Sequence, residues 1–480
     1  PGLPPLTVIE TITLGADAAT VKLPASGTIA DLMPSGSRHV VVLVNGRSSG
    51  DPGVARDNFQ LQFNEDTGAN YHHQYFAGLA SSASAARASL TYGLMQGSSD
   101  ASPANAMSGG FMLIPHAFNT ANFKSALVLS GADEDIVQTA TLTWTNTAAV
   151  TDVTVGSLAG DLAAGTIEEI LSGDSAFTAV DVPSQVGDIS IINYLRSSHT
   201  GDNNDGIDIV LNDDETAGNY SGGLLMGIGS SVFSSNTPAH QTGGCNGDNA
   251  DANHFSGALT TVNAFNYGAN DPHVMTLSGE VSVSAASGFV GLCSTTRNNV
   301  EAVTSVNIKP KSVSTFLAGS GQWVYAVPKT LLERKTLTDA TTTSVTFTLS
   351  GLTIPDSVKD LRLNVYAKGD EASVYDWVSM SINSDTTAAN YDNQELYGIG
   401  GSAGAGTSAA SRRLGTIGSG NSGANVFGGF TALFPHYAST SLHKHYLSLG
   451  GGSEQIANML SGRWENDDAI ATITLTLEQG

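Results

Sequence analysis

The sequence predicts an all-β protein of three tandem antiparallel β-sandwich domains, with jelly-roll-like connections, that arose by an internal triplication. Apolar residues alternate with Ser, Thr or Asn along many short segments, which is the pattern of antiparallel strands. One series of such segments occurs three times along the 480 residues. Composition agrees, because 54 Gly and a charged fraction of only 13% favour short strands and turns over helices.

The first landmark of each copy is a strand that ends in Asn-x-Asp and is followed a few residues later by Asn-Tyr. In the first copy this signature is formed by Asn64, Asp66, Asn70 and Tyr71. The equivalent residues are Asn212, Asp214, Asn219 and Tyr220 in the second copy, and Asn383, Asp385, Asn390 and Tyr391 in the third. Because Asn and Asp side chains cap backbone N–H groups, the signature predicts a strand that runs into a turn.

Three further strands follow each signature at nearly constant spacing. A pair of small residues opens the first of them, a Gly ends the second, and the last begins with Ala. They lie at 109–114, 127–131 and 149–155, at 256–259, 275–279 and 302–308, and at 428–433, 447–451 and 469–475. This order predicts domains at residues 1–171, 172–331 and 332–480, each large enough to bury its own core. The alternation predicts sheets with one face exposed to water.

The copies differ in their closing strands and in their loops. The first two copies close with strands at 162–166 and 316–326, which the third copy lacks, and a neighbouring chain could supply that strand. Segments rich in Ser, Gly and Ala follow each Asn-Tyr and are expected to form long recognition loops. These segments are 81–105, 227–253 and 398–425. Short helices are expected at 80–90 and 356–360.

The charge of the chain disfavours several classes of partner. Lys and Arg number 20 against 44 Asp and Glu, and the net charge of −24 argues against binding to nucleic acid or to anionic membranes. No apolar run reaches the length of a membrane span, so we expect a soluble protein. The N-terminus lacks the pattern of a signal peptide, which favours synthesis in a cytoplasm. Cys245 and Cys293 form either one disulfide or two thiols.

The signature residues are the main candidates for ligand binding. Their side-chain oxygens could converge on Ca²⁺ in each copy. These candidates are Asn64, Asp66, Asn70, Asn212, Asp214, Asn219, Asn383, Asp385 and Asn390. One carboxylate in each copy is few for calcium, so a structural capping role is preferred and no cofactor is predicted. Tyr71, Tyr220 and Tyr391 could stack on sugar rings if exposed, or belong to the core if buried.

Nothing in the sequence matches a common catalytic motif. We find no nucleophile elbow, phosphate-binding loop or zinc-protease motif, and no copy concentrates the side chains that chemistry would need. We therefore expect that the protein is not an enzyme.

The signature and the strands that follow it resemble a module found in structural proteins of tailed bacteriophages. The match is closest at Ala302–Val306 and Phe316–Ser320, and the resemblance extends over all three copies. It implies a non-enzymatic role in the virion, as a head decoration or tail appendage, after synthesis in the host cytoplasm. The implied partners are other virion proteins in an oligomeric assembly. The alternatives are a carbohydrate-binding adhesin or receptor-binding module, for which host-surface glycans are the partner, and an extracellular surface-layer or filament protein.

Overall fold

The structure of the chain is a computed structural model. It describes residues 6–33, 37–50, 56–79, 81–102, 106–132, 136–164, 167–173, 188–200, 204–228, 230–237, 241–250, 253–263, 273–281, 288–297, 303–312, 314–318, 320–326, 335, 343–352, 354, 360–399, 402–408, 411–422, 427–452 and 456–478. These residues contain 32 strands, one four-residue helix, α1 (Ile29–Leu32), and two short 3₁₀ helices. The prediction of an all-β fold is confirmed. Among the described residues no helix is long and apolar enough to cross a membrane.

The first unit (residues 6–173) consists of two antiparallel sheets. Strands of the large sheet lie in the order β1-β12-β3-β8-β9-β10-β5-β6, and those of the small sheet in the order β2-β11-β4-β7. Their bounds are β1 (Leu6–Thr13), β2 (Thr20–Leu23), β3 (Val40–Gly46), β4 (Arg56–Phe63), β5 (Tyr71–Leu79), β6 (Ser82–Leu90), β7 (Gly93–Ser98), β8 (Ser108–Ile114), β9 (Lys124–Ala132), β10 (Ile136–Trp144), β11 (Val153–Ser157) and β12 (Ile167–Gly173). Because β12 pairs with both β1 and β3, this unit extends past the predicted boundary at residue 171.

The second unit (residues 188–326) also has a large and a small sheet. Their strand orders are β16-β15-β20-β19-β18-β13-β22 and β17-β14-β21. Their bounds are β13 (Asp188–Leu195), β14 (Asn204–Leu211), β15 (Tyr220–Ile228), β16 (Ser231–Thr237), β17 (Gln241–Asn246), β18 (Ser256–Asn263), β19 (His273–Val281), β20 (Gly288–Arg297), β21 (Val306–Pro310) and β22 (Gly321–Ala326), with the 3₁₀ helix η1 (Ala217–Asn219) before β15.

The third unit (residues 343–478) is built in the same way. Its sheets have the orders β24-β29-β30-β31-β26-β27 and β23-β32-β25-β28. Their bounds are β23 (Ser344–Thr348), β24 (Leu361–Ala367), β25 (Tyr375–Ile382), β26 (Tyr391–Ile399), β27 (Ser402–Ser408), β28 (Arg413–Gly418), β29 (Gly428–Phe434), β30 (Lys444–Gly452), β31 (Ile456–Trp464) and β32 (Thr472–Leu477), with η2 (Ala388–Asn390) before β26. In this unit β24 is the last described strand of its sheet, whereas β12 and β22 flank the equivalent strands of the other units.

Within each unit the two sheets pack face to face around a hydrophobic cluster. In the first unit this cluster joins Val40 and Val42 of the large sheet to Phe59 and Leu61 of the small sheet. Equivalent clusters lie between the two sheets of the second and third units. Val40, Val42 and Val44, at alternate positions of β3, belong to this cluster, as the period of a strand requires. Each pair of sheets is therefore sandwich-like.

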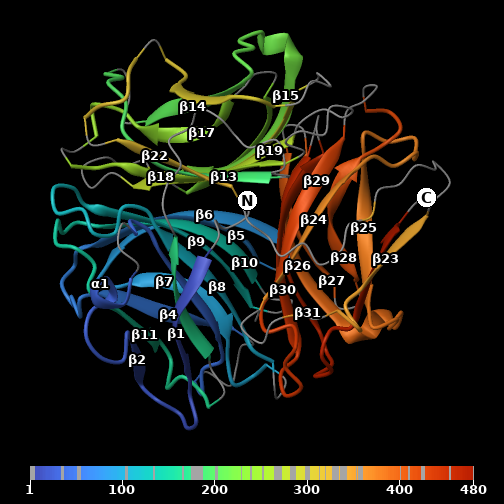
Figure 1. Ribbon diagram of the computed structural model, residues 1–480, viewed down its shortest axis with the longest axis horizontal. Helices are drawn as coiled ribbons and strands as arrows, with labels where there is room; N and C mark the ends of the chain where they lie inside the picture. Colours follow the sequence, from blue (N-terminus) through green and yellow to red (C-terminus); the bar gives the residue numbers. More distant parts are fainter. Residues whose placement is uncertain are drawn as a thin grey trace.

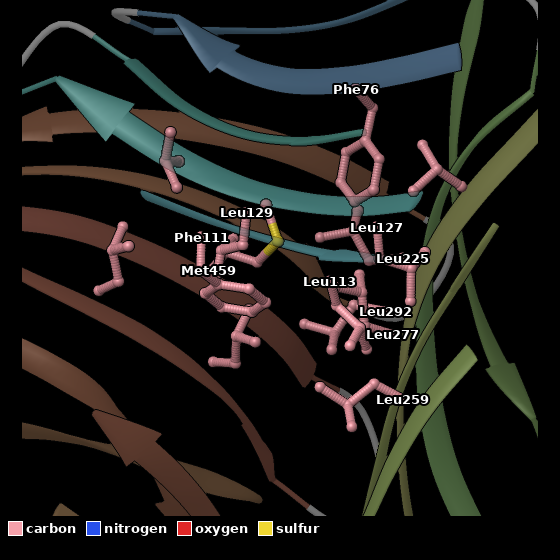
Figure 2. Close-up of a cluster of buried hydrophobic side chains, with 14 of the residues drawn as sticks. Phe76, Phe111, Leu113, Leu127, Leu129, Leu225, Leu259, Leu277, Leu292 and Met459 are labelled. Carbon is pink, nitrogen blue, oxygen red and sulfur yellow. The ribbon is translucent and has the colours of Figure 1, made fainter. Parts of the chain in front are cut away.

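The opposite faces of the three large sheets meet in one shared cluster at the centre of the molecule. Figure 1 shows the blue-to-teal, green-to-yellow and orange-to-red units side by side around this centre. Figure 2 shows Leu129, Leu277 and Met459, one from each unit, among the side chains that form the cluster. Leu129 and Leu277 occupy equivalent positions two residues before a Gly, as does Leu449, and all three are at most 2% exposed. The three units thus share a core in addition to their own cores.

The expectation that one face of each sheet is exposed to water is wrong for the central strands of the large sheets. Every residue of β9, β10, β20 and β31 is buried. In β3, for example, Val41 and Leu43 face the shared core while Val40 and Val42 face the core of the first unit. The Ser and Thr residues that suggested a wetted face, such as Thr139 and Thr141, are buried with the apolar side chains.

Two other expectations about local structure are also corrected. Residues 82–90, within the segment expected to be helical, form strand β6, which pairs with β5. The three segments expected to be long loops each contain two strands: β6 and β7, β16 and β17, and β27 and β28. These strands lengthen the large and small sheets. Of the second expected helix, residues 356–359 lie outside the described part of the chain.

Candidate functional site

The Asn that opens each signature ties two strands of the small sheet together. Asn64 follows β4 with a φ of 52°, a left-handed conformation that Asn tolerates better than most residues. Its Oδ1 accepts hydrogen bonds from the backbone N and the Oγ1 of Thr151, at 2.7 and 3.0 Å, and its Nδ2 donates to the carbonyl of Ala149 at 2.8 Å. Asn212 and Asn383 have similar φ values, and each accepts a hydrogen bond from a backbone N–H just before the last small-sheet strand of its unit.

The signature Asp accepts hydrogen bonds from groups brought together by the turn. Asp66 Oδ2 accepts from Asn70 Nδ2 at 2.9 Å and from Trp144 Nε1 at 2.8 Å, and its Oδ1 accepts from the backbone N of Gly68. Asp385 makes the same contacts with Asn390 and Trp464, both at 2.8 Å. These side-chain oxygens are therefore engaged with protein donors.

In the second unit an arginine takes the place of the tryptophan. Arg297 Nε donates to Asp214 Oδ2 at 3.1 Å, and Asn219 Nδ2 donates to the same oxygen at 2.9 Å. Desolvation raises the pKa of Asp214, but hydrogen bonds from Asn219, Thr216 and Arg297 outweigh it and lower the value to about 2. The carboxylate is thus held in its charged form by neighbouring donors.

The signature tyrosines are core residues, so of the two alternatives the structure has the one in which they are buried and not the one in which they stack on sugar rings. Tyr71, Tyr220 and Tyr391 are 0%, 2% and 0% exposed, because each ring lies between the two sheets of its unit. Their hydroxyl oxygens accept hydrogen bonds from the backbone N atoms of Phe63, Leu211 and Ile382, at 2.8, 3.0 and 2.8 Å. A sugar ring at the surface cannot reach these faces.

Together these contacts are the arrangement that the structural interpretation of the signature predicts. A Ca²⁺ ion at Asp66, Asp214 or Asp385 would have to displace N–H donors from the carboxylate. The nearby carboxylates of Glu65 and Glu215 already pair with Lys22 and Lys309. The described residues contain no group of three or more His, Cys, Asp or Glu side chains that could hold a metal ion. Cys245 and Cys293 form no disulfide, and both thiols are buried.

The junctions between units are the second place where equivalent residues come together. A β-carbon on Gly78 would lie 2.8 Å from the carbonyl oxygen of Glu395 in the third unit. One on Gly227 would lie 2.6 Å from Cβ of Phe76 in the first unit, and one on Gly398 would lie 2.5 Å from Oγ of Ser234 in the second. Each of the three glycines lies seven residues after its signature Tyr.

A second set of glycines repeats this pattern on the next strands. Gly131 abuts Ser461 of the third unit, Gly279 abuts Thr141 of the first, and Gly451 abuts Ser294 of the second. In both sets the first unit meets the third, the second meets the first, and the third meets the second. The contacts therefore run in one direction around a closed ring.

An open pocket of about 630 Å³ lies in the third unit, between the edge of its large sheet and its small sheet. Its lining includes Asn393 and Glu395 of β26, Ser411 and Arg412 before β28, Arg413 at the start of β28, and Glu478 after β32. Arg413 is fixed on two sides, because its guanidinium lies 4.5 Å from the Trp377 ring centre and its Nε donates to Glu478 Oε2 at 2.9 Å. Ser379 Oγ donates to Glu478 Oε1 at 2.6 Å.

Glu395 is the unusual group in this pocket. Its side chain is almost fully buried, with 5% of the residue exposed. Its Oε1 has no hydrogen-bond partner among the described residues, and its Oε2 lies 3.7 Å from Arg413 Nη1. Burial raises the pKa of Glu395 to about 8; nearby Arg413 opposes this shift and Glu478 adds to it. A buried carboxyl with a strongly raised pKa beside a pocket is a common mark of a functional site.

No motif along the chain indicates this pocket directly, because its residues come from separate segments. A comparison of the copies contained the one usable signal. The fourth residue after the signature tyrosine is Tyr75, Leu224 or Glu395. The residue directly after the last small-sheet strand is Leu158 in the first unit, Lys311 in the second and Glu478 in the third. These positions are equivalent, because the backbone N–H of each donates to an equivalent carbonyl in its unit. At both positions the third copy alone carries a carboxyl group.

Comparisons with known proteins do not place the chain in a family. No family model and no curated protein matches it. Among solved structures, it is similar to a protein of unknown function from the DUF3598 family of Nostoc punctiforme, with 8% identity, a TM-score of 0.10, and coverage of 51% of this chain and 96% of that one. It is also similar to OccK11 (OpdR) and OccK7 (OpdD) of Pseudomonas aeruginosa.

The identities to these two proteins are 7% and 9%, and the TM-scores are 0.08 and 0.09. The matches cover 94% and 88% of this chain, and 98% and 99% of those. TM-scores this low do not establish a shared fold. The functional argument therefore depends on the residues of this chain.

Proposed function

We propose that the chain is a non-enzymatic structural protein of a bacteriophage virion, a capsid decoration or tail appendage that acts through contacts with other virion proteins. In this proposal it consists of three jelly-roll-like sandwich domains that arose by triplication, close to residues 1–171, 172–331 and 332–480. The common strand order supports the triplication, because β3-β8-β9-β10-β5-β6, β13-β18-β19-β20-β15-β16 and β24-β29-β30-β31-β26-β27 follow the chain in the same way.

The observation that carries the proposal is the closed ring of contacts between units. Equivalent glycines join each unit to its neighbour in one direction, and equivalent leucines meet in the shared core. When each of three units makes the same head-to-tail contact with the next and the third contacts the first, the result is a compact body with approximate threefold symmetry. Such a body is rigid and offers a similar surface three times, which suits docking onto a larger assembly.

The charge of the chain supports the same class of partner. A net charge of −24 disfavours binding to the packaged nucleic acid, so protein contacts on the outside of a particle are the consistent choice. The phage context itself comes from the resemblance of the repeated module. Localisation in the virion, after synthesis in the host cytoplasm, is part of the proposal.

The test is to quantify the chain in purified particles of the phage that encodes it. Virions are banded on a density gradient, and their proteins are measured by mass spectrometry in each fraction. We expect a fixed ratio of this chain to the major capsid or tail protein across the particle fractions. Absence from the particles, recovery with a cell-surface fraction instead, or turnover of a substrate by the purified chain would contradict the proposal.

A further inference from the structure

The pocket of the third unit has features that the fold does not require. The first and second units build the same sheets with Tyr75 and Leu224 in place of Glu395, and with Leu158 and Lys311 in place of Glu478. The pocket arginine is also specific to this unit. In the strand register Arg413 of β28 lies opposite Ser379 of β25, next to a β-bulge. At the equivalent bulge of the second unit, Gln241 of β17 lies opposite Asp208 of β14. The third unit therefore has two carboxyl groups and an arginine at positions where the second unit folds with Leu224, Lys311 and Gln241.

The pocket carries positive charge in a strongly acidic chain. Arg412 and Arg413 contribute two positive charges, and Glu478 contributes one negative charge that already pairs with Arg413. Glu395 is uncharged near neutral pH, because burial raises its pKa to about 8. Arg412 forms no ion pair among the described residues, so its guanidinium remains able to bind a carboxylate in two-pronged geometry.

The rest of the lining is uncharged, and Ala388, Gly406 and Leu477 are its apolar members. Ser411 and Thr476 supply hydroxyl groups, whereas Ser379 Oγ donates to Glu478, and Asn393 is 2% exposed and donates its Nδ2 to the carbonyl of Ser411. Glu395, as a neutral carboxyl, can both donate and accept a hydrogen bond, and one of its oxygens has no protein partner among the described residues. A ligand with several hydroxyl groups matches these donors and acceptors. The volume, about 630 Å³, lies within the range of small-molecule sites and accommodates one or two sugar rings.

We propose that this pocket binds an acidic monosaccharide, a sugar ring that carries one carboxylate, such as a uronic or sialic acid. Arg412 pairs with the sugar carboxylate, while Ser411 and Glu395 bind its hydroxyl groups. The inference is independent of the virion proposal, because it concerns a pocket lined by residues of the third unit. If both hold, the particle carries a binding site for acidic surface glycans.

The test uses saturation-transfer NMR titrations of the full chain with D-glucuronate and N-acetylneuraminate. D-glucose and acetate serve as probes that lack the carboxylate or the sugar ring. We expect saturable binding of at least one acidic sugar, and binding at least about tenfold weaker for glucose and for acetate, since either one lacks half of the recognised groups.

Three variants locate the site. Arg412→Gln removes the free guanidinium, and Glu395→Leu introduces the residue that the second unit carries at this position. Each should weaken binding of the acidic sugar by about tenfold or more. Arg47→Gln, in the first unit and far from the pocket lining, is the matched control and should leave the affinity unchanged. Thermal unfolding of each variant shows that it is folded.

Several results would overturn the inference. These are binding of neither acidic sugar to the wild-type chain, equal affinity for glucose or for acetate, and affinity unchanged in a folded Arg412→Gln variant. None of these binding results depends on whether the chain is found in virions. A failure of the sugar-binding inference therefore leaves the proposed structural role unaffected, and a failure of the virion proposal leaves the sugar-binding inference unaffected.

Discussion

Asp385 illustrates how a single signature residue stabilises its unit. Its carboxylate accepts hydrogen bonds from Asn390 Nδ2 and Trp464 Nε1, and Trp464 is buried in the core of the third unit. Asp385→Ala leaves these donors without their acceptor, which typically costs about 1–3 kcal/mol for a buried group. We expect a loss of this size in the free energy of unfolding, measured in urea. Asp161→Ala, at an exposed position in the first unit, should change it by less than about 0.5 kcal/mol.

Glu395 makes a prediction about pH. Its pKa in the folded chain is about 8, above the ordinary value of 4.5, so the folded state keeps a proton that the unfolded state releases. Stability contributed by this group is therefore full below about pH 4.5 and is lost as the pH rises toward 8. The slope approaches about 1.4 kcal/mol for each pH unit in this window.

The measurement is the difference in unfolding free energy between wild type and Glu395→Gln at several pH values. The wild type should lose stability relative to the variant from about pH 5 to pH 8, and the difference should then level off. Four buried histidines and the half-buried His116 have lowered pKa values; these residues act in both proteins and cancel in the difference, the buried four being His39, His73, His273 and His445. A difference that does not change with pH would show that Glu395 is ionised in the folded chain.

At the residue scale, the sequence was informative about local contacts and uninformative about the pocket. The Asn-x-Asp and Asn-Tyr residues lie within one turn, so their capping interactions follow from short-range chemistry. The pocket residues Glu395, Arg413 and Glu478 come from three different strands or strand ends. Only the pairing of those strands brings them together, and a pattern along the chain does not contain that pairing.

At the scale of strands, alternation identified the elements but not their surroundings. A strand with Ser or Thr on every second residue is typical of a sheet wetted on one side. Here some of those residues face a neighbouring unit: Ser294 lies against Gly451 of the third unit, and Ser461 lies against Gly131 of the first. Small polar side chains and glycines allow two sheets to approach closely, which the alternation alone does not distinguish from exposure.

The junction glycines predict a clear effect of one added methyl group. In Gly78→Ala the new Cβ would lie 2.8 Å from a backbone oxygen, that of Glu395, which cannot move without shifting strand β26. Overpacking of this kind costs about 1–3 kcal/mol. Gly218→Ala is the matched control, since nothing lies within 4 Å of its added Cβ. Chemical denaturation should show a clear loss for the first variant and little change for the second. Equal stability of both would contradict the close junction.

At the scale of the whole molecule, the repeats predicted three units but not their relation. Each copy has apolar residues enough for a core of its own, so independent tandem domains were the natural expectation. The second apolar face of each large sheet is what joins them, because it stays buried only when the other two units cover it. A repeated sequence predicts the number of units. The contacts between the units depend on which sheet faces are apolar, and that is known only once the strands are paired.

The most direct test of this account is calorimetric unfolding of the full chain and of three equivalent core variants. Leu129→Ala, Leu277→Ala and Leu449→Ala each remove one leucine from the shared core, one in each unit. Such substitutions typically cost about 2–5 kcal/mol. We predict one cooperative transition for the wild type, shifted as a whole to lower temperature by each substitution. Three separate transitions, with each variant lowering only the one that belongs to its own unit, would contradict the shared core.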